Sequence, residues 1–272
     1  MTELSILGAV ILVIGIGIYL TGWRRKRILG RPFPAAWLDI VRNALPFYDR
    51  LSDDEQQQLL NNIRLFIADK RFHGCGGLTI TDEIRVVVAA EACLLLLNRR
   101  TAVYPRLKHI LIYPDAFRAR HPQHNEDGTV GGGEKGLLGE SWHYGKVILS
   151  WDDVVHGIRN TEDGQNVALH EFSHQLDSES GSANGAPPLH SNAYSTWASV
   201  LSKEFEELNR DFAHHHESVM DYYGATNPAE FFAVATETFF EKPRQMHSKH
   251  RELFEVLKTY YAVDPRRWLH DE

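Results

Sequence analysis

The chain opens on a segment that is apolar almost without interruption. From Leu4 to Trp23 nearly every position is aliphatic, aromatic or glycine, and Arg24, Arg25, Lys26 and Arg27 follow at once. About 20 such residues span a bilayer as a helix. The charges come after the apolar run and no cleavage site follows, which favours an anchor over a signal peptide. We therefore predict one transmembrane helix in residues 1–27, with the chain beyond it on the cytoplasmic side.

The remaining chain has mostly helical periodicity. Residues 28–36 contain a glycine and two prolines and are interpreted as a linker. Helix starts are predicted at Ser52, where Glu55 completes a capping box, and at Thr81. Further helices are expected at 167–177, 194–208, from Pro228 onward, and at 252–261, while the short apolar runs 109–113 and 146–151 indicate strands. Residues 121–136 are interpreted as a loop. This pattern predicts one mainly helical α+β domain over residues 37–272, with a small sheet.

Composition narrows the classes of function. The chain has 272 residues, of which 43% are hydrophobic and 24% charged, as is ordinary for a globular protein with a substantial core. The formal net charge is −7, whereas a nucleic-acid-binding protein usually presents a basic surface. We therefore expect no direct contact with nucleic acid.

The candidate chemistry lies in the apolar run 167–177, which contains the pattern His170-Glu171-x-x-His174. On a helix, residues four apart project from one face, so both imidazoles can bind one cation. Glu171 lies beside them and can accept a proton from a water that the cation activates. The alternative is two histidines on an ordinary amphipathic helix, but apolar neighbours would bury this one, and buried polar groups need partners. The pattern therefore predicts a zinc hydrolase.

A catalytic zinc site needs a third protein ligand. The further histidine of the metzincin pattern is absent after His174. Glu230 is a candidate because Asn227 and Pro228 place it in the first turn of a helix, although an acid there can also simply oppose the helix dipole. Glu237 lies two turns further along nearly the same face and is the rival ligand.

Several stretches resemble known zinc peptidases. The segment Tyr223–Ala233 is similar to the third-ligand segment of anthrax lethal factor, a thermolysin-like (gluzincin) enzyme. Over most of the chain, the sequence resembles the bacterial Mlc titration factor A family. The matching stretches are Phe72–Glu83, Gly139–Trp142, Ile148–Trp151, His170–Asp177, Ala183–Leu189 and Asn227–Phe232.

The resemblance implies Zn²⁺ bound by His170, His174 and Glu230, with Glu171 as general base and Tyr223 as an auxiliary hydrogen-bond donor. It also implies a zincin-like core, a small mixed sheet plus the motif helix with added helices, and weak aminopeptidase-like activity. One position departs from the thermolysin-like pattern. The acid expected four residues after the third ligand is replaced by Val234, so Glu237 or Asp177 would have to orient a histidine.

These observations predict a zinc-dependent peptidase at the bacterial inner membrane, or in the cytoplasm if the N-terminal segment is not inserted. Its expected partners are a peptide or protein substrate, the membrane and, because family members are linked to binding the glucose repressor Mlc, a transcriptional repressor. The alternative is a regulatory protein that sequesters a repressor and has little peptidase activity. A structural zinc site would gain nothing from Glu171, which favours the enzyme. An intramembrane protease is excluded because the motif helix is short and polar at its ends.

Overall fold

The computed structural model describes residues 2–99, 101–115 and 145–269. Its N-terminal elements are α1 (Thr2–Leu29), α2 (Ala35–Ala44), α3 (Asp53–Asp69), β1 (Arg71–Gly74), α4 (Asp82–Leu94) and β2 (His109–Tyr113). After the gap follow β3 (Lys146–Ser150), α6 (Trp151–Arg159), α7 (Val167–Asp177), α8 (Tyr194–His214), α9 (Pro228–Glu241), α10 (Pro243–Lys249) and α11 (Arg251–Tyr261). Short 3₁₀ turns lie at Tyr48–Arg50, Ser178–Ser180, Tyr222–Ala225 and Pro265–Trp268. The predicted loop at 121–136 lies outside the described residues.

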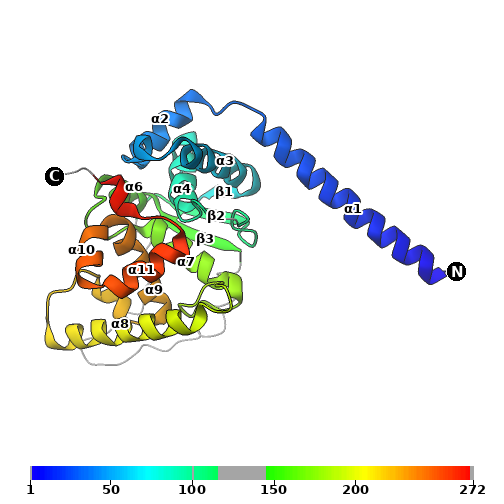
Figure 1. Cartoon of the computed structure of the whole chain (residues 1–272). Helices are drawn as coiled ribbons and strands as arrows, with labels where there is room; N and C mark the ends of the chain where they lie inside the picture. Colours follow the sequence, from blue (N-terminus) through cyan, green and yellow to red (C-terminus); the bar gives the residue numbers. More distant parts are fainter. Residues whose placement is uncertain (1, 100, 116–144, 270–272) are drawn as a thin grey trace.

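The N-terminal helix projects away from the body of the molecule (Figure 1). At its base Arg24 forms an ion pair with Asp69 and donates to the carbonyl of Ala68 at 2.6 Å, which ties α1 to the end of α3. Within the part of the chain that the structure describes, no helix is both long and apolar enough to cross a membrane. The predicted transmembrane helix is therefore not supported, and the location of the protein stays a prediction.

The sheet contains three strands in the order β1-β2-β3. Both pairings are parallel, with Phe72 opposite Ile110 and Ile110 opposite Val147. The prediction of a mixed sheet is therefore wrong for the described strands. The connection from β1 to β2 runs through α4, and a helical crossover of this kind returns the chain in the same direction. β1 itself was not predicted, because two of its four residues, Arg71 and His73, are polar.

The motif helix α7 packs against the sheet and against α4. Its buried apolar residues are Ala168, Leu169, Phe172 and Leu176, and the ring of Phe172 meets that of Phe66 from α3 edge-on, with centroids 5.7 Å apart. The helical repeat places the polar motif residues on the opposite face, toward α9. There α9 is itself buried along nearly its whole length. Figure 1 shows α8 to α11 gathered on the side of the molecule opposite α2 and α3.

Candidate metal centre

Helix α7 brings the two motif histidines together. Asn166 caps the helix by accepting from the N–H of Leu169 at 3.0 Å, which fixes where the first turn begins. One turn apart, His170 and His174 direct their rings into the same space, and their Nε2 atoms are 3.2 Å apart. Both rings are largely buried, with 13% and 20% of the side chains exposed. The local sequence therefore places two imidazole nitrogens at one point.

Helix α9 supplies a carboxylate to that point. Asn227 accepts from the N–H groups of Ala229 and Glu230, and Pro228 occupies the first helical position, as the sequence predicts. Glu230 consequently projects from the first turn toward α7. Its Oε2 lies 2.9 Å from Nε2 of His170 and 3.3 Å from Nε2 of His174.

The donor set fits a single metal ion. One ligand atom from each of His170, His174 and Glu230 lies within 4.8 Å of the others, and among the described residues this is the only such cluster of His, Cys, Asp or Glu. Two ligands of a tetrahedral zinc with bonds of about 2.0–2.1 Å are about 3.3 Å apart. The Nε2–Nε2 distance of 3.2 Å matches that spacing. Two imidazoles and one carboxylate are also the ligand types of thermolysin-like zinc sites.

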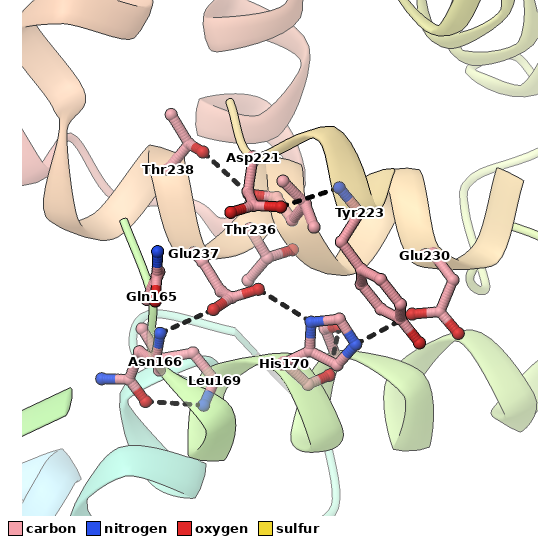
Figure 2. A network of polar contacts seen from close by, with 12 residues as sticks. Gln165, Asn166, Leu169, His170, Asp221, Tyr223, Glu230, Thr236, Glu237 and Thr238 are labelled. Carbon is pink, nitrogen blue, oxygen red and sulfur yellow. Dashed lines mark hydrogen bonds and ion pairs between the residues drawn. The ribbon is translucent and has the colours of Figure 1, made fainter. Parts of the chain in front are cut away.

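Glu237 contacts the other side of His170. Its Oε1 lies 2.7 Å from Nδ1 of His170, and its Oε2 accepts the backbone N–H of Asn166 at 2.6 Å (Figure 2). The carboxylate therefore fixes the His170 ring with Nε2 directed toward Glu230, the arrangement that orients metal-bound histidines generally. The structure separates the two rival glutamates: Glu230 lies at the common point, and Glu237 lies behind His170.

Charges around the site shift its titrating groups strongly. Burial opposes a charge on His170, but Glu230 and Glu237 outweigh it and raise the pKa of His170 to about 10. Burial also opposes the charge of Glu230, yet hydrogen bonds from His170 and His174 hold the pKa of this carboxyl far below its usual range. Burial, together with Glu230 and Glu171, raises the pKa of Tyr223 to about 12, so its hydroxyl stays protonated at neutral pH. A positive charge is accordingly favoured where the three side chains meet.

The cluster opens into a cavity of about 930 Å³. Glu171 and Tyr223 line it together with the three candidate ligands, and the Tyr223 ring centroid lies 5.8 Å from that of His170. The further lining is contributed by Arg106, Gly145, Gln175, Ser178, Gly181, Ser182, Ala183, Asn184, Asn227, Pro228 and Ala229. All five predicted site residues therefore lie at one cavity.

The sequence did not lead us to predict the buried polar residues behind the site, which are Asn166, Glu91 and Glu241. Besides capping α7, Asn166 donates from its Nδ2 to Glu91 of α4 at 3.2 Å. Glu91 and Glu241 are almost fully buried, at 2% and 6% exposure. The signal available in the sequence was the cap itself: Asn166 stands immediately before the apolar run of the motif helix.

A histidine pair and an opposing glutamate around a cavity, with a second glutamate beside the histidines, form the arrangement of side chains found in mononuclear metallohydrolases. A family model of the glucose-regulated metallo-peptidases M90 matches residues 20–262. The chain belongs to this family.

Relatives match over most of the chain. An uncharacterised protein of Synechocystis sp. is 42% identical over 267 residues, which is 94% of this chain and 97% of that protein. The Mlc titration factor A of Serratia proteamaculans is 30% identical over 234 residues (85% and 88%), and that of Yersinia pestis 28% identical over 241 residues (86% and 88%). These matches confirm the family resemblance found in the sequence.

Proposed function

We propose that this protein is a zinc-dependent peptidase in which Glu171 acts as general base. The observation that carries the proposal is the convergence of His170, His174 and Glu230 at a cavity that Glu171 also lines. Zn²⁺ bound there would act as a Lewis acid toward the scissile carbonyl and favour ionisation of a water molecule. Membership of a metallopeptidase family supports the same reaction class.

The residues of the chain then have distinct tasks. Glu171 accepts the proton of the attacking water and transfers it to the leaving amine, because it lines the cavity beside the ligands without being one of them. Tyr223, protonated because its pKa is raised to about 12, donates a hydrogen bond to the oxyanion of the tetrahedral intermediate. Glu237 holds His170 in the orientation that directs Nε2 to the cavity.

The test is the variant Glu171→Gln. This change removes the base but keeps the shape and all three ligands, so zinc content should equal that of the wild type. Peptide hydrolysis should fall at least about 100-fold. Tyr223→Phe is the matched comparison, since it removes one donor and should reduce turnover by a smaller factor. Hydrolysis at the wild-type rate in zinc-loaded Glu171→Gln would contradict the mechanism.

An aminopeptidase preference is part of the proposal and is supported only by the family resemblance. Peptides with a free N-terminus should then be cleaved faster than the same peptides after N-terminal acetylation. Equal rates on both would identify an endopeptidase.

A second candidate function is the binding of a transcriptional repressor. It is favoured by the name of two relatives, Mlc titration factor A, which describes those proteins as titrating Mlc. If the wild-type protein binds zinc, hydrolyses no peptide in a diverse library and still retains a repressor on a column, the regulatory function is the correct one. Repressor binding by Glu171→Gln at wild-type strength would show that both functions occur and are separable.

A further inference from the structure

The 3₁₀ turn Tyr222–Ala225 holds Tyr223 beside the metal centre. Asp221 begins this turn, because its Oδ1 accepts the backbone N–H of Tyr223 at 2.7 Å (Figure 2). The Tyr223 ring lies next to that of His170, and its hydroxyl donates to Glu230, which contributes to the raised pKa of the phenol. The position of the turn therefore decides where the hydroxyl lies.

Gly224, the next residue of the turn, has no room for a side chain. It is buried, and a Cβ at this position would lie 3.1 Å from Cδ2 of Leu208 in α8 and 3.2 Å from Cβ of Val234 in α9. Non-bonded carbon atoms attract best at about 3.5–4.0 Å, so a methyl group here would overlap both neighbours. The φ angle of Gly224 is not positive. Close packing, and not backbone conformation, therefore requires glycine here.

Val234 supports the turn from the same helix face that carries Glu230. The two residues are four apart, which is about one helical turn. At Val234 the sequence lacks the acid of the thermolysin-like pattern, and in the structure Glu237 contacts the histidine instead. The valine is buried, at 2% exposure, and packs against Gly224. One face of α9 thus carries both the third candidate ligand and the support for the turn that contains Tyr223.

We propose that Gly224 is a positioning residue for Tyr223. The absence of a side chain lets the 3₁₀ turn pack directly on Val234 and Leu208, and the closeness of this packing sets the distance between the Tyr223 hydroxyl and the metal centre. The inference rests on the proposed function, in which that hydroxyl donates to the oxyanion, and it adds the contact that fixes the position of the donor.

A methyl group at position 224 should displace this donor without removing it. Tyr223 directly precedes Gly224, so a shift of the turn also moves the phenol. A misplacement of about 1 Å can cost about 100-fold in rate, so a shift of a few tenths of an ångström should cost about 3–10-fold. The hydrogen bond to the oxyanion is made only in the transition state. We therefore expect kcat to fall while KM stays near the wild-type value.

The main experiment measures kcat, KM and zinc affinity of the full chain for Gly224→Ala and Val234→Ala, each with and without Tyr223→Phe. Gly224→Ala overfills the contact, and Val234→Ala removes the methyl groups on which the turn rests. Both should lower kcat about 3–10-fold and leave zinc affinity unchanged. Neither should lower kcat further once Tyr223→Phe has removed the hydroxyl. An equal fold-loss in both backgrounds overturns the proposal, because Gly224 would then act on a group other than this hydroxyl.

Val41→Ala is the matched control for Val234→Ala. Val41 is fully buried as well, but it lies in α2, which packs on α4 and α6. The variant loses the same methyl groups from the core and should be destabilised similarly without a shift of the 3₁₀ turn, so its kcat should equal that of the wild type. A loss of kcat as large as in Val234→Ala would show that lowered stability alone explains the effect, and would overturn the proposal.

A second measurement uses the metal-free protein and needs no turnover. Nuclear Overhauser effects between the ring protons of Tyr223 and His170, whose ring centroids are 5.8 Å apart, report the position of the turn. They should be weaker in Gly224→Ala and Val234→Ala than in the wild type and Val41→Ala. Equal intensities in all four proteins overturn the proposal, and Val234→Ala decides it if Gly224→Ala does not fold. If the intensities change as expected but the wild type cleaves no peptide, the proposed function fails while the placement of Tyr223 by Gly224 is supported.

Discussion

Glu230 lies at the cavity, whereas Glu91 and Glu241 lie behind the motif helix, and the surroundings of these carboxyls shift their pKa in opposite directions. Glu230 faces His170 and His174 at the cavity, and hydrogen bonds from both rings outweigh its burial and hold its pKa far below the usual range. Glu91 and Glu241 lie behind the motif helix, where burial raises the pKa of each to about 8.

This difference in pKa between Glu230 and the two buried acids shows that the number of acidic residues says little about where a cation can bind. A carboxylate becomes a candidate ligand when histidine nitrogens share its space and a cavity gives access, as at Glu230. Without them, burial favours the protonated acid. Asn166 separates the two groups, because its backbone N–H donates to Glu237 and its side chain donates to Glu91.

The largest effect should come from Glu230→Ala. Removal of a metal ligand should nearly abolish zinc binding, because two histidines alone leave the coordination incomplete. Glu237→Gln should weaken binding only about 10–100-fold, since it disturbs the orientation of His170 and not a ligand. Zinc titration followed by metal analysis ranks the two variants. Should Glu237→Gln empty the site while Glu230→Ala retains zinc, Glu237 and not Glu230 is the metal ligand.

The buried acids should affect stability and its dependence on pH. A carboxyl whose pKa is about 8 in the folded state, against the ordinary pKa of 4.5 in the unfolded chain, stabilises the folded state fully below the lower pKa. That stability is lost as the pH rises through about 8. Glu241→Gln and Glu91→Gln should therefore be near wild type at pH 5 and more stable than wild type at pH 8, by about 1–3 kcal/mol.

Urea unfolding of the metal-free protein at both pH values measures this effect. Comparison with the wild type removes the contribution of the histidine–glutamate pairs, which titrate in all variants. A difference between Glu241→Gln and wild type that is the same at both pH values would show that the carboxyl is ionised throughout.

The smallest effect is expected for Asn166→Ser, which tests whether the two groups are independent. Serine is a good N-cap, so the motif helix should keep its first turn. The bond to Glu91 is lost, which should reduce the free energy of unfolding by about 1 kcal/mol. Zinc affinity should change less than about threefold, because Glu237 is held by a backbone N–H that serine retains. A tenfold loss of affinity would instead mean that the buried acids act on the metal centre through Asn166.

Local signals in the sequence predicted much of this structure. Ser52 and Glu55 form the expected capping box, Thr81 caps α4, and Asn227 with Pro228 begins α9. These features depend on neighbours within one turn, which a sequence displays directly. The strand β1 and helix α6 were not predicted, because β1 has few apolar residues and α6 begins at Trp151, which the apolar run had assigned to a strand.

Long-range contacts could not be predicted in the same way. Glu230 and Glu237 lie on nearly the same face of one helix, and both are near His170, so periodicity alone left both open as ligands. Only the packing of α9 on α7 shows that one meets Nε2 and the other Nδ1. The parallel direction of the sheet and the burial of Glu91 beside Asn166 likewise depend on segments far apart in the chain.

Helix α9 contacts His170 twice, through Glu230 at Nε2 and through Glu237 at Nδ1. These two contacts affect the rate at which the site takes up a metal ion. Glu237 fixes the ring from behind, and the Asn227 cap fixes the backbone that carries Glu230. The donor atoms therefore need little rearrangement to meet an ion, and the conformational entropy lost on binding is small. A preorganised site of this kind favours fast association and reversible exchange, so that removal and return of the metal should leave the protein folded.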